Sequence, residues 1–323
     1  MKRILVTGGA GFIGSHLCDT LLNQGHAVIC LDNFNTYYNP QIKRQNIVSI
    51  ISNKNIKLFE GDILDLQFLR QIFQTSAIEI IVHLAARAGV RPSIYKPLLY
   101  QKVNIQGTNN LLEMAKEFQI EKFIFGSSSS VYGQNTKVPF REDDSVDHPI
   151  SPYAATKRAC ELICYTYHHL YKLPVTCLRF FTVYGPRQRP DMAIHIFTKR
   201  IFHDEKISMF GEGNSQRDYT YISDIIDGIC KSIEHCKEFH IYNLGDSRTI
   251  ELRKLIDLIA NCIGKEPLIQ ILPVQPGDVH ITFADISKAK REIGYHPKFE
   301  IEEGIEKFVD WYKTMNSLSK FRF

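Results

Sequence analysis

Two side chains four residues apart, Tyr153 and Lys157, form the part of this sequence best suited to acid–base chemistry. Residues at this spacing share one face of a helix, so the lysine ammonium can stabilise the phenolate form of the tyrosine. A phenolate can then take a proton from a substrate hydroxyl. The same spacing is common on helix surfaces, so its meaning depends on the neighbouring motifs. Serines 127–130 precede the pair, and such serines either relay a proton or cap the backbone groups of a loop.

A glycine-rich turn near the start of the chain gives the pair its meaning. Gly8, Gly11 and Gly14 are spaced three apart, after a short apolar strand and at the start of a helical pattern. Glycine permits the tight turn and lets the backbone approach a pyrophosphate, which the N-terminus of the helix attracts. Asp32 ends the next strand, where a carboxylate accepts hydrogen bonds from both ribose hydroxyls and repels a 2′-phosphate. The sequence therefore predicts bound NAD rather than NADP.

Two later strands end in residues that suit the same cofactor. Asp62 and Ile63 follow the third strand, where the edge of the adenine is expected. Residues 84–86 (Leu-Ala-Ala) follow the fourth strand, where small side chains leave room for the cofactor. A nicotinamide bound beside Tyr153 indicates redox chemistry on a substrate that carries a hydroxyl group.

Alternating apolar strands and helices position these motifs. Strands are predicted at residues 2–7, 27–31, 56–60, 78–84, 122–125 and 175–180, and helices at 14–24, 66–73, 103–118 and 152–171. This alternation predicts an α/β fold with a Rossmann-type doubly wound parallel sheet. Residues 127–130 lie at the end of the fifth strand, at the edge where open α/β sheets bind ligands.

The second part of the chain breaks this rhythm. The segment from about residue 187 to 217 is polar and turn-rich, residues 239–244 predict one more strand of the sheet, and helices interrupted by prolines follow from residue 249. We expect residues 1–182, together with about 218–248, to form an NAD-binding Rossmann domain. Residues 183–217 and 249–323 are expected to form a smaller, discontinuous substrate lobe.

Composition and charge exclude several classes of protein. The net charge of +4 comes from 39 basic and 35 acidic residues without a basic block, which argues against nucleic acid as a partner. No apolar run is long enough to cross a membrane, and the apolar stretch at residues 4–6 is too short for a signal peptide. The eight cysteines are scattered and complete no metal site with histidines, so no metal is predicted. A cytoplasmic enzyme with reduced cysteines is expected.

The motifs together resemble one family. They are residues 7–14, 32, 62, 84–86, 104, 127–133, 153–157, 179–185 and 217–224, and they cover almost the whole chain. On these residues the chain resembles an extended short-chain dehydrogenase/reductase of the nucleotide-sugar epimerase and dehydratase group. The resemblance implies tightly bound NAD, a nucleoside diphosphate sugar in the smaller lobe, and hydride transfer from sugar C4 to give a 4-keto sugar.

The resemblance also implies roles for individual residues. The catalytic residues that it implies are Tyr153, Lys157 and Ser128. The cofactor-binding residues are Gly8, Gly11, Phe12, Ile13, Gly14, Asp32, Asn33, Asn35, Lys43, Asp62, Ile63, Leu84, Ala85, Ala86, Asn104, Tyr153, Lys157 and Phe180. A homodimer is implied through the helices at 103–118 and 152–171. By analogy, the product serves polysaccharide biosynthesis.

The residues before Tyr132 distinguish the branches of the group. Dehydratases resemble Thr-Asp-Glu-Val-Tyr-Gly, with an acid pair that eliminates water, and decarboxylases resemble Thr-Ser-Glu-Val-Tyr-Gly. Residues 128–133 of this chain read Ser-Ser-Ser-Val-Tyr-Gly, so neither carboxylate is present. Without an acid to drive elimination, the hydride simply returns to the sugar, and this predicts a 4-epimerase. A dehydratase or decarboxylase would need an acid from elsewhere in the fold.

Three further segments, residues 32–38, 180–192 and 275–279, resemble UDP-glucuronate 4-epimerases closely. UDP-glucose 4-epimerases typically carry Asn where this chain has Thr182. A sugar with a C6 carboxylate needs nearby donors, and guanidinium binds carboxylate through two parallel hydrogen bonds. The substrate-binding residues expected from the resemblance are Arg91, Ser128, Ser129, Ser130, Tyr153, Thr182, Arg189, Arg217 and Asp278, of which Arg91, Arg217 and Asp278 match contacts to the diphosphate or the uridine ribose.

Two alternatives stay open at this point. The nearest is a 4-epimerase of UDP-glucose or UDP-N-acetylglucosamine, which comparison of turnover on the different sugars would distinguish. The other is a non-catalytic NAD-binding regulator, because a fold alone does not establish an activity. The presence of Tyr153, Lys157 and Ser128 together argues against the regulator.

Overall fold

The central element of the protein is a parallel β-sheet of seven strands, seen in a computed structural model that describes residues 1–274 and 279–320. The strand order is β10-β6-β5-β4-β1-β2-β3, and every neighbouring pair is parallel. The strands are β1 (Arg3–Thr7), β2 (Ala27–Asp32), β3 (Ile56–Glu60), β4 (Ile80–His83), β5 (Lys122–Ser128), β6 (Val175–Phe180) and β10 (Phe239–Leu244). The order reverses direction at β1, which confirms the doubly wound parallel sheet.

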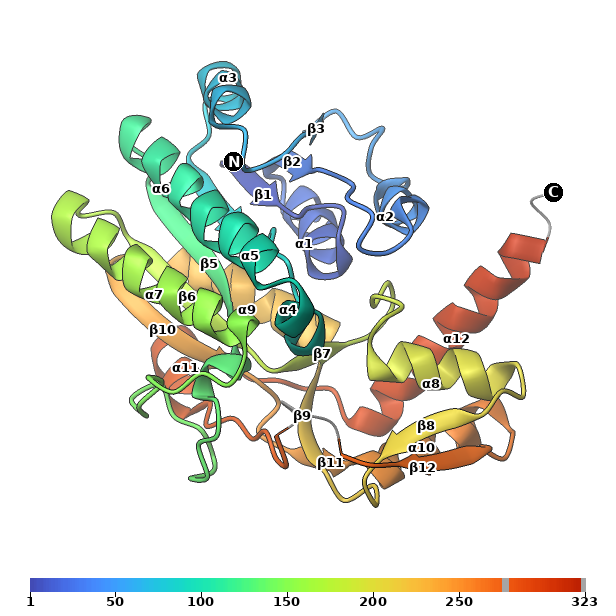
Figure 1. The fold of residues 1–323 in the computed structure, drawn as a ribbon. Helices are drawn as coiled ribbons and strands as arrows, with labels where there is room; N and C mark the ends of the chain where they lie inside the picture. Colours follow the sequence, from blue (N-terminus) through green and yellow to red (C-terminus); the bar gives the residue numbers. More distant parts are fainter. Residues whose placement is uncertain (275–278, 321–323) are drawn as a thin grey trace.

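Helices cover both faces of this sheet (Figure 1). One apolar layer joins the sheet to α1 (Phe12–Asn23) and α9 (Ile222–His235) through residues such as Leu17 and Ile229. The opposite layer joins it to α3 (Leu66–Ser76), α6 (Gly107–Glu117) and α7 (Pro152–Tyr171) through residues such as Leu111 and Cys160. Because both faces are buried, the strands are apolar on both sides, as the sequence pattern indicates.

The remaining elements form the second lobe and the connections. They are α2 (Pro40–Ile47), α4 (Val90–Tyr95), α5 (Pro97–Tyr100), a π-helical turn (Gln101–Gln106), the 3₁₀ helix η2 (Ser129–Tyr132), β7 (Thr182–Tyr184), α8 (Ala193–Phe202), β8 (Ile207–Phe210), β9 (Gln216–Tyr221), β11 (Thr249–Glu251), α10 (Leu252–Ile263), β12 (Ile269–Leu272), α11 (Ser287–Ile293) and α12 (Ile301–Lys320). Two small sheets, β11-β9-β7 and β12-β8, lie in the second lobe (Figure 1).

The structure corrects two expectations about secondary structure. The helix predicted at 103–118 is a π-helical turn, Gln101–Gln106, followed by α6. The segment at 187–217, expected to be turn-rich, contains α8 and β8. Ile194, Phe197 and Ile201 are spaced three and four apart and form the buried face of α8, so the helical signal was present among the polar residues.

A buried carboxylate, Asp218 of β9, joins the second lobe to the sheet. It accepts hydrogen bonds from the backbone N–H groups of Asp246 (2.7 Å), Ser247 (3.0 Å) and Ala284 (3.1 Å) and from the hydroxyl of Thr220 (3.2 Å). Burial raises the pKa of Asp218 to about 7 in spite of these donors. The folded protein therefore binds a proton on Asp218 that the unfolded chain releases at lower pH.

This shift predicts how stability depends on pH. A carboxyl whose pKa is raised on folding contributes stability at low pH and loses it as the pH rises from about 4 to about 7. The free energy of unfolding of the wild-type protein, relative to that of Asp218→Asn, should fall by about 2 kcal/mol between pH 5 and pH 8. Urea unfolding of both proteins at the two pH values measures this difference. A difference that does not change with pH would contradict the assigned titration.

Candidate active site

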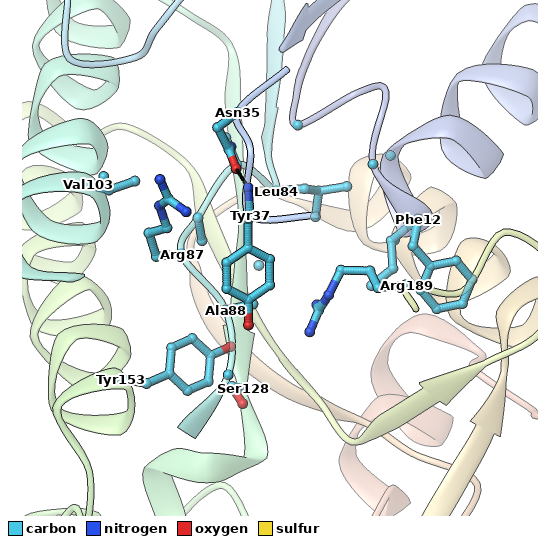
Figure 2. Close-up of a pocket in the computed structure, with 18 of the residues that line it drawn as sticks. Phe12, Asn35, Tyr37, Leu84, Arg87, Ala88, Val103, Ser128, Tyr153 and Arg189 are labelled. Carbon is cyan, nitrogen blue, oxygen red and sulfur yellow. Dashed lines mark hydrogen bonds between the residues drawn. The ribbon is translucent and has the colours of Figure 1, made fainter. Parts of the chain in front are cut away.

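A cavity of about 490 Å³ opens at the carboxyl ends of β1, β2, β4, β5 and β6. This is the edge at which open α/β sheets bind ligands, and the volume is typical of a ligand site. Residues from the glycine turn, from the loop after β2, from the first turn of α7 and from β7 line it together. Figure 2 shows the side chains of Tyr37, Tyr153 and Arg189, which come from three of the segments around the cavity, pointing into one space.

The glycine turn forms the wall of the cavity beside α1. Gly8 has a φ of 68°, and a Cβ added to it would lie 2.9 Å from the backbone nitrogen of Ala85. A Cβ on Gly14 would collide with the carbonyl oxygen of Gly8. Gly11 is the N-cap of α1, so the N–H groups of the first turn have no partner within the helix. The turn is thus closed against side chains and presents backbone donors, as a pyrophosphate requires.

The loop after β2 carries a connected set of polar groups at the next part of the cavity. Asp32 is buried, and its Oδ1 accepts from the backbone N–H of Phe34 (2.9 Å) and from Nζ of Lys43 (3.0 Å). Asn33 donates to Oδ2 of Asp62 (2.8 Å) and accepts from Nδ2 of Asn35 (2.8 Å). All the residues predicted here line the cavity: Asp32, Asn33, Asn35, Lys43, Asp62 and Ile63.

The end of β4 forms the floor. Leu84, Ala85 and Ala86, which are predicted to leave room for the cofactor, line the cavity. Behind them, the ring nitrogens of His83 contact the hydroxyls of Thr7 (2.8 Å) and Thr108 (3.0 Å). Burial, with a smaller contribution from the charge of Lys157, lowers the pKa of His83 to about 3. His83 is therefore a neutral structural link and not an acid or base of the site.

Asn104 differs from the other predicted cofactor residues in its position. Its side chain does not reach the cavity lining but holds the backbone of Arg87 from behind. Its Oδ1 accepts from the N–H of Arg87 (2.8 Å), and its Nδ2 donates to the carbonyl of Arg87 (3.1 Å) and to the hydroxyl of Thr156 (3.0 Å). Asn104 thus shapes the wall from the second layer.

The predicted catalytic residues Tyr153, Lys157 and Ser128 all line this cavity. Ser151 caps α7 by accepting from the N–H of Ala154 (3.1 Å), and Pro152 occupies the first helical position, so Tyr153 lies in the first turn. Lys157 follows one turn later, is buried, and donates to the carbonyl of Gly126 (2.5 Å). Figure 2 shows the hydroxyls of Tyr153 and Ser128 facing the same space.

The serine cluster divides between two environments. Ser127 is part of the cavity lining, but its hydroxyl donates to Oε1 of Glu161 (2.7 Å). Ser128 lies at the end of β5 and contacts the hydroxyl of Ser130 (3.1 Å), and its oxygen caps the 3₁₀ helix η2. Ser128, Ser129 and Ser130 all line the cavity, together with Phe180 and Thr182. These five residues therefore share one cavity.

Arg189 enters the cavity from the opposite side, on the loop after β7 (Figure 2). Its Nε and Nη2 donate to the two carboxylate oxygens of Asp191 (2.9 and 3.0 Å). The hydroxyl of Tyr37 also donates to Asp191 (3.3 Å), and the Tyr37 ring lies 5.8 Å from the guanidinium groups of both Arg189 and Arg87. Sequence reasoning identified Arg189 but assigned no role to Tyr37, Arg87 or Asp191.

Two of the three residues predicted to contact the diphosphate or the uridine ribose, Arg91 and Arg217, lie outside this cavity lining. Arg91 is exposed, with its guanidinium 4.8 Å from the ring centre of Phe210. Arg217 donates through Nη1 to the carbonyl of His280 (3.1 Å). Neither is part of the cavity lining formed by the described residues, and Asp278 lies outside the described residues.

The fold and this cavity define an extended short-chain dehydrogenase/reductase of the nucleotide-sugar group. Residues 5–308 match the sequence model of the family described as GDP-mannose 4,6 dehydratase, and the chain belongs to this family. In the described part of the chain, no helix combines the length and the apolar character that crossing a membrane demands.

Several of the relatives that match over the full length are named as 4-epimerases of UDP-sugars. The chain is 44% identical over 321 residues to a UDP-glucuronate 4-epimerase of Thermodesulfobacterium geofontis, and 99% of each chain is covered. It is 38% identical to the UDP-glucuronic acid 4-epimerase of Bacillus cereus, solved with UDP-glucuronic acid and NAD, with a TM-score of 0.91 and coverage of 97% and 99%. A UDP-glucose 4-epimerase of Thermotoga maritima, solved with UDP-glucose, gives 36% identity, a TM-score of 0.89 and the same coverage.

Proposed function

We propose that this protein is an NAD-dependent UDP-glucuronate 4-epimerase that interconverts UDP-glucuronate and UDP-galacturonate through a 4-keto intermediate. The observation that carries this proposal is the composition of the cavity around Tyr153. It combines Lys157 and Ser128 with hydroxyl and guanidinium donors, and the acids among its described lining residues lie at the ends of β2 and β3 instead. The full-length similarity to UDP-glucuronate 4-epimerases supports the same substrate.

The positions of the carboxylates favour epimerisation over elimination, although the family description names a dehydratase. Among the described residues that line the cavity, the acids are Asp32 and Asp62, at the ends of β2 and β3. Both lie at the part of the cavity that suits the adenosine ribose, and Asp32 is paired with Lys43. Elimination of water needs an acid beside the sugar. Ser129 and Ser130 occupy the two positions that hold an acid pair in the motif typical of dehydratases.

The donors opposite Tyr153 suit a C6 carboxylate. Thr182, Ser129 and Ser130 supply hydroxyl groups at the cavity wall. Asp191 takes two of the five N–H donors of Arg189 and fixes the orientation of its guanidinium. In the described chain, Nη1 of Arg189 has no hydrogen-bond partner, so a substrate carboxylate can use it.

The proposed mechanism assigns one task to each residue. Tyr153 takes the proton of the sugar 4-hydroxyl, and the buried ammonium of Lys157 favours the phenolate that this requires. Ser128 hydrogen-bonds the reacting oxygen. Thr182 and the serines hold the carboxylate. This matters because the 4-keto form of a glucuronate is a β-keto acid, which loses carbon dioxide if its carboxylate takes the orientation that decarboxylation requires. Tyr153 gives the proton back to the 4-oxygen when the 4-keto sugar is reduced again.

The residues present fit NAD. A Cβ at Gly8 or Gly14 would obstruct the turn, which leaves a cradle for a pyrophosphate, and Asp32 is a buried carboxylate at the place of a ribose. Gly8, Gly11, Phe12, Ile13 and Gly14 would hold the pyrophosphate, and Asp32 with Asn33 and Asn35 the adenosine side. NAD, when bound, supplies an acceptor for the hydride of C4 and a donor for its return.

Proton NMR of the purified protein with UDP-glucuronate, without added cofactor, tests the proposal. Appearance of UDP-galacturonate would support both the substrate and the retention of NAD. Conversion of UDP-glucose or UDP-N-acetylglucosamine instead, under the same conditions, would keep the 4-epimerase mechanism and overturn the assigned sugar. No conversion of any of these sugars, even with added NAD, would favour the non-catalytic regulator.

Replacement of Arg189 by glutamine should weaken the binding of UDP-glucuronate more than that of UDP-glucose. Loss of one charge-assisted hydrogen bond raises the dissociation constant about 10- to 100-fold, and UDP-glucose, which lacks the carboxylate, should be nearly unaffected. Calorimetric titration of both nucleotides measures the two values. Arg187→Gln is the matched control, because Arg187 pairs with Asp19 (2.6 Å) outside the cavity lining. Equal losses for both sugars would place Arg189 on their shared diphosphate instead.

We propose further that the protein is a cytoplasmic homodimer. Exposed apolar side chains on α7, namely Leu162, Tyr165, Leu170 and Tyr171, support an interface through this helix and α6. All eight cysteines are free thiols and seven are buried, which supports a reducing compartment. The proposed division of the chain, with residues 1–182 and about 218–248 for NAD and 183–217 and 249–323 for the sugar, is supported by β10 joining the large sheet.

A further inference from the structure

The catalytic helix carries a buried carboxylate in line with Tyr153 and Lys157. Glu161 lies four residues beyond Lys157 and is completely buried. The spacing places all three on one face of α7, the face that packs against β5. Lys157 binds the carbonyl of Gly126 and Glu161 binds the hydroxyl of Ser127, so the helix holds two consecutive residues of β5 directly before Ser128.

Glu161 is itself held by an arginine of the neighbouring strand. Arg179 of β6, 1% exposed, donates from Nε to Oε1 (2.9 Å) and from Nη2 to Oε2 (3.0 Å) of Glu161. Ser127 adds its bond to Oε1 (2.7 Å), and Arg158 donates to Oε2 (3.2 Å). The carboxylate is thus fixed by four donors from α7, β5 and β6, which leaves it little freedom to move.

A chain of hydrogen bonds leads from the same arginine to the second lobe. Nη1 of Arg179 donates to the hydroxyl of Tyr132 (3.0 Å), which donates to Oδ1 of Asn243 (2.7 Å). Nδ2 of Asn243 donates to the backbone carbonyls of Phe140 (2.9 Å) and Asp285 (3.1 Å). Tyr132 ends the 3₁₀ helix that begins at Ser129, so this chain of hydrogen bonds fixes the serine cluster from its other end.

A buried ion pair of this kind is weak evidence for a role in stability. Desolvation of two charges offsets most of their attraction, and apolar residues of the same volume often serve stability equally well. None of the steps assigned to Tyr153, Lys157 and Ser128 uses Glu161 or Arg179. What the pair does uniquely is to specify the register of α7 against the ends of β5 and β6, where the reacting groups lie.

We propose that Glu161 and Arg179 are positioning residues, which hold Ser127 and thereby set the Ser128 hydroxyl against that of Tyr153 for proton transfer. The proposal rests on the proposed 4-epimerase function. We call the Glu161–Arg179 pair a clamp because it ties α7 to β5. Tyr153 of α7 and Ser128 of β5 must act on the same substrate from two separate elements, and a misplacement of about 1 Å can cost about 100-fold in rate. Neither Glu161 nor Arg179 belongs to the cavity lining formed by the described residues, so the pair acts on the reaction only through these neighbours.

Ser127→Ala is the sharpest test, since it removes the contact between the clamp and β5 while Arg179 and Arg158 still neutralise Glu161. We expect kcat to fall about 10- to 100-fold, with the KM for the sugar and the amount of retained NAD unchanged. Ser127→Thr, which keeps the hydroxyl, should recover most of the rate. Ser232→Ala is the control, because it deletes another buried hydroxyl, bonded to the carbonyl of Gly228 (2.7 Å) in α9, and should leave kcat unchanged.

Two results would overturn the proposal. One is a kcat of Ser127→Ala within twofold of the wild-type value, and the other is an equal loss of kcat in Ser232→Ala. Glu161→Gln should lower kcat at least as much as Ser127→Ala, and if it does not fold, Ser127→Ala decides alone. The assay uses whichever UDP-sugar the wild-type protein turns over. An error in the assigned sugar would therefore be seen with the wild-type protein, whereas an error in the positioning role would be seen only in the variants.

Discussion

The Tyr153→Phe variant should lose epimerase activity by about 10²- to 10⁴-fold, the usual contribution of a general acid–base group. The substitution removes only the hydroxyl that exchanges the proton with the sugar. The ring keeps its edge-on contact with Tyr100, whose ring centre lies 6.2 Å away, so the first turn of α7 should stay in place. Proton NMR of UDP-glucuronate turnover measures the loss, and release of the cofactor by denaturation measures the NAD that stays bound.

Tyr167→Phe provides the matched control for this experiment. Tyr167 lies on the same helix, and its hydroxyl donates to Glu113 outside the cavity lining. This variant should retain full activity and full NAD content. Normal turnover in Tyr153→Phe would remove the tyrosine from the mechanism. Loss of NAD together with activity in Tyr153→Phe would show instead that the hydroxyl serves mainly to bind the cofactor.

A methyl group at Gly14 should abolish cofactor binding. The added Cβ would collide with the carbonyl oxygen and carbon of Gly8 and with Cα of Gly9, which are backbone atoms that cannot rotate away. The turn would have to open, and the donors that approach a pyrophosphate would move with it. Purified Gly14→Ala should therefore contain little or no NAD and show little or no epimerisation, which absorbance of the released cofactor and the NMR assay measure.

Gly25→Ala tests whether that effect is specific to the turn. Gly25 lies just beyond the other end of α1, has a φ of 80°, and has no atom within 4 Å of an added Cβ. Alanine there costs about 1 kcal/mol of backbone strain but should leave NAD bound. Retention of NAD by Gly14→Ala would mean that the turn is not the pyrophosphate site. Loss of NAD from both variants would point to a general loss of stability.

Local spacing accounts for the parts of the site that the sequence predicted well. The glycines from Gly8 to Gly14 lie around a single turn, and Tyr153 and Lys157 lie on a single helix. Their relative positions therefore follow from the local conformation of the chain. The elements that carry them agree with prediction, and the boundaries of α7 and β6 are the predicted ones. The helix of the segment at 187–217 was missed because its apolar positions are separated by polar residues, although their spacing is helical.

Contacts between distant segments were beyond prediction, because strand order and packing decide them. Tyr37 meets Asp191 across 154 residues, and Glu161 meets Ser127 across 34. Neither pair has a spacing that signals contact. The position of Asn104 behind Arg87 belongs to the same class, since side-chain direction at a π-helical turn does not follow from the usual helical periodicity.

The sequence by itself determined the parallel sheet, the dinucleotide turn and the Tyr153–Lys157 pair, because apolar periodicity and local spacing are properties of neighbouring residues. Tertiary structure alone decided which acids reach the cavity, how Asp191 and Tyr37 orient Arg189, and how Glu161 and Arg179 clamp the end of β5. These contacts depend on which strand ends lie side by side. Only the packing of the complete fold brings such residues within hydrogen-bond distance.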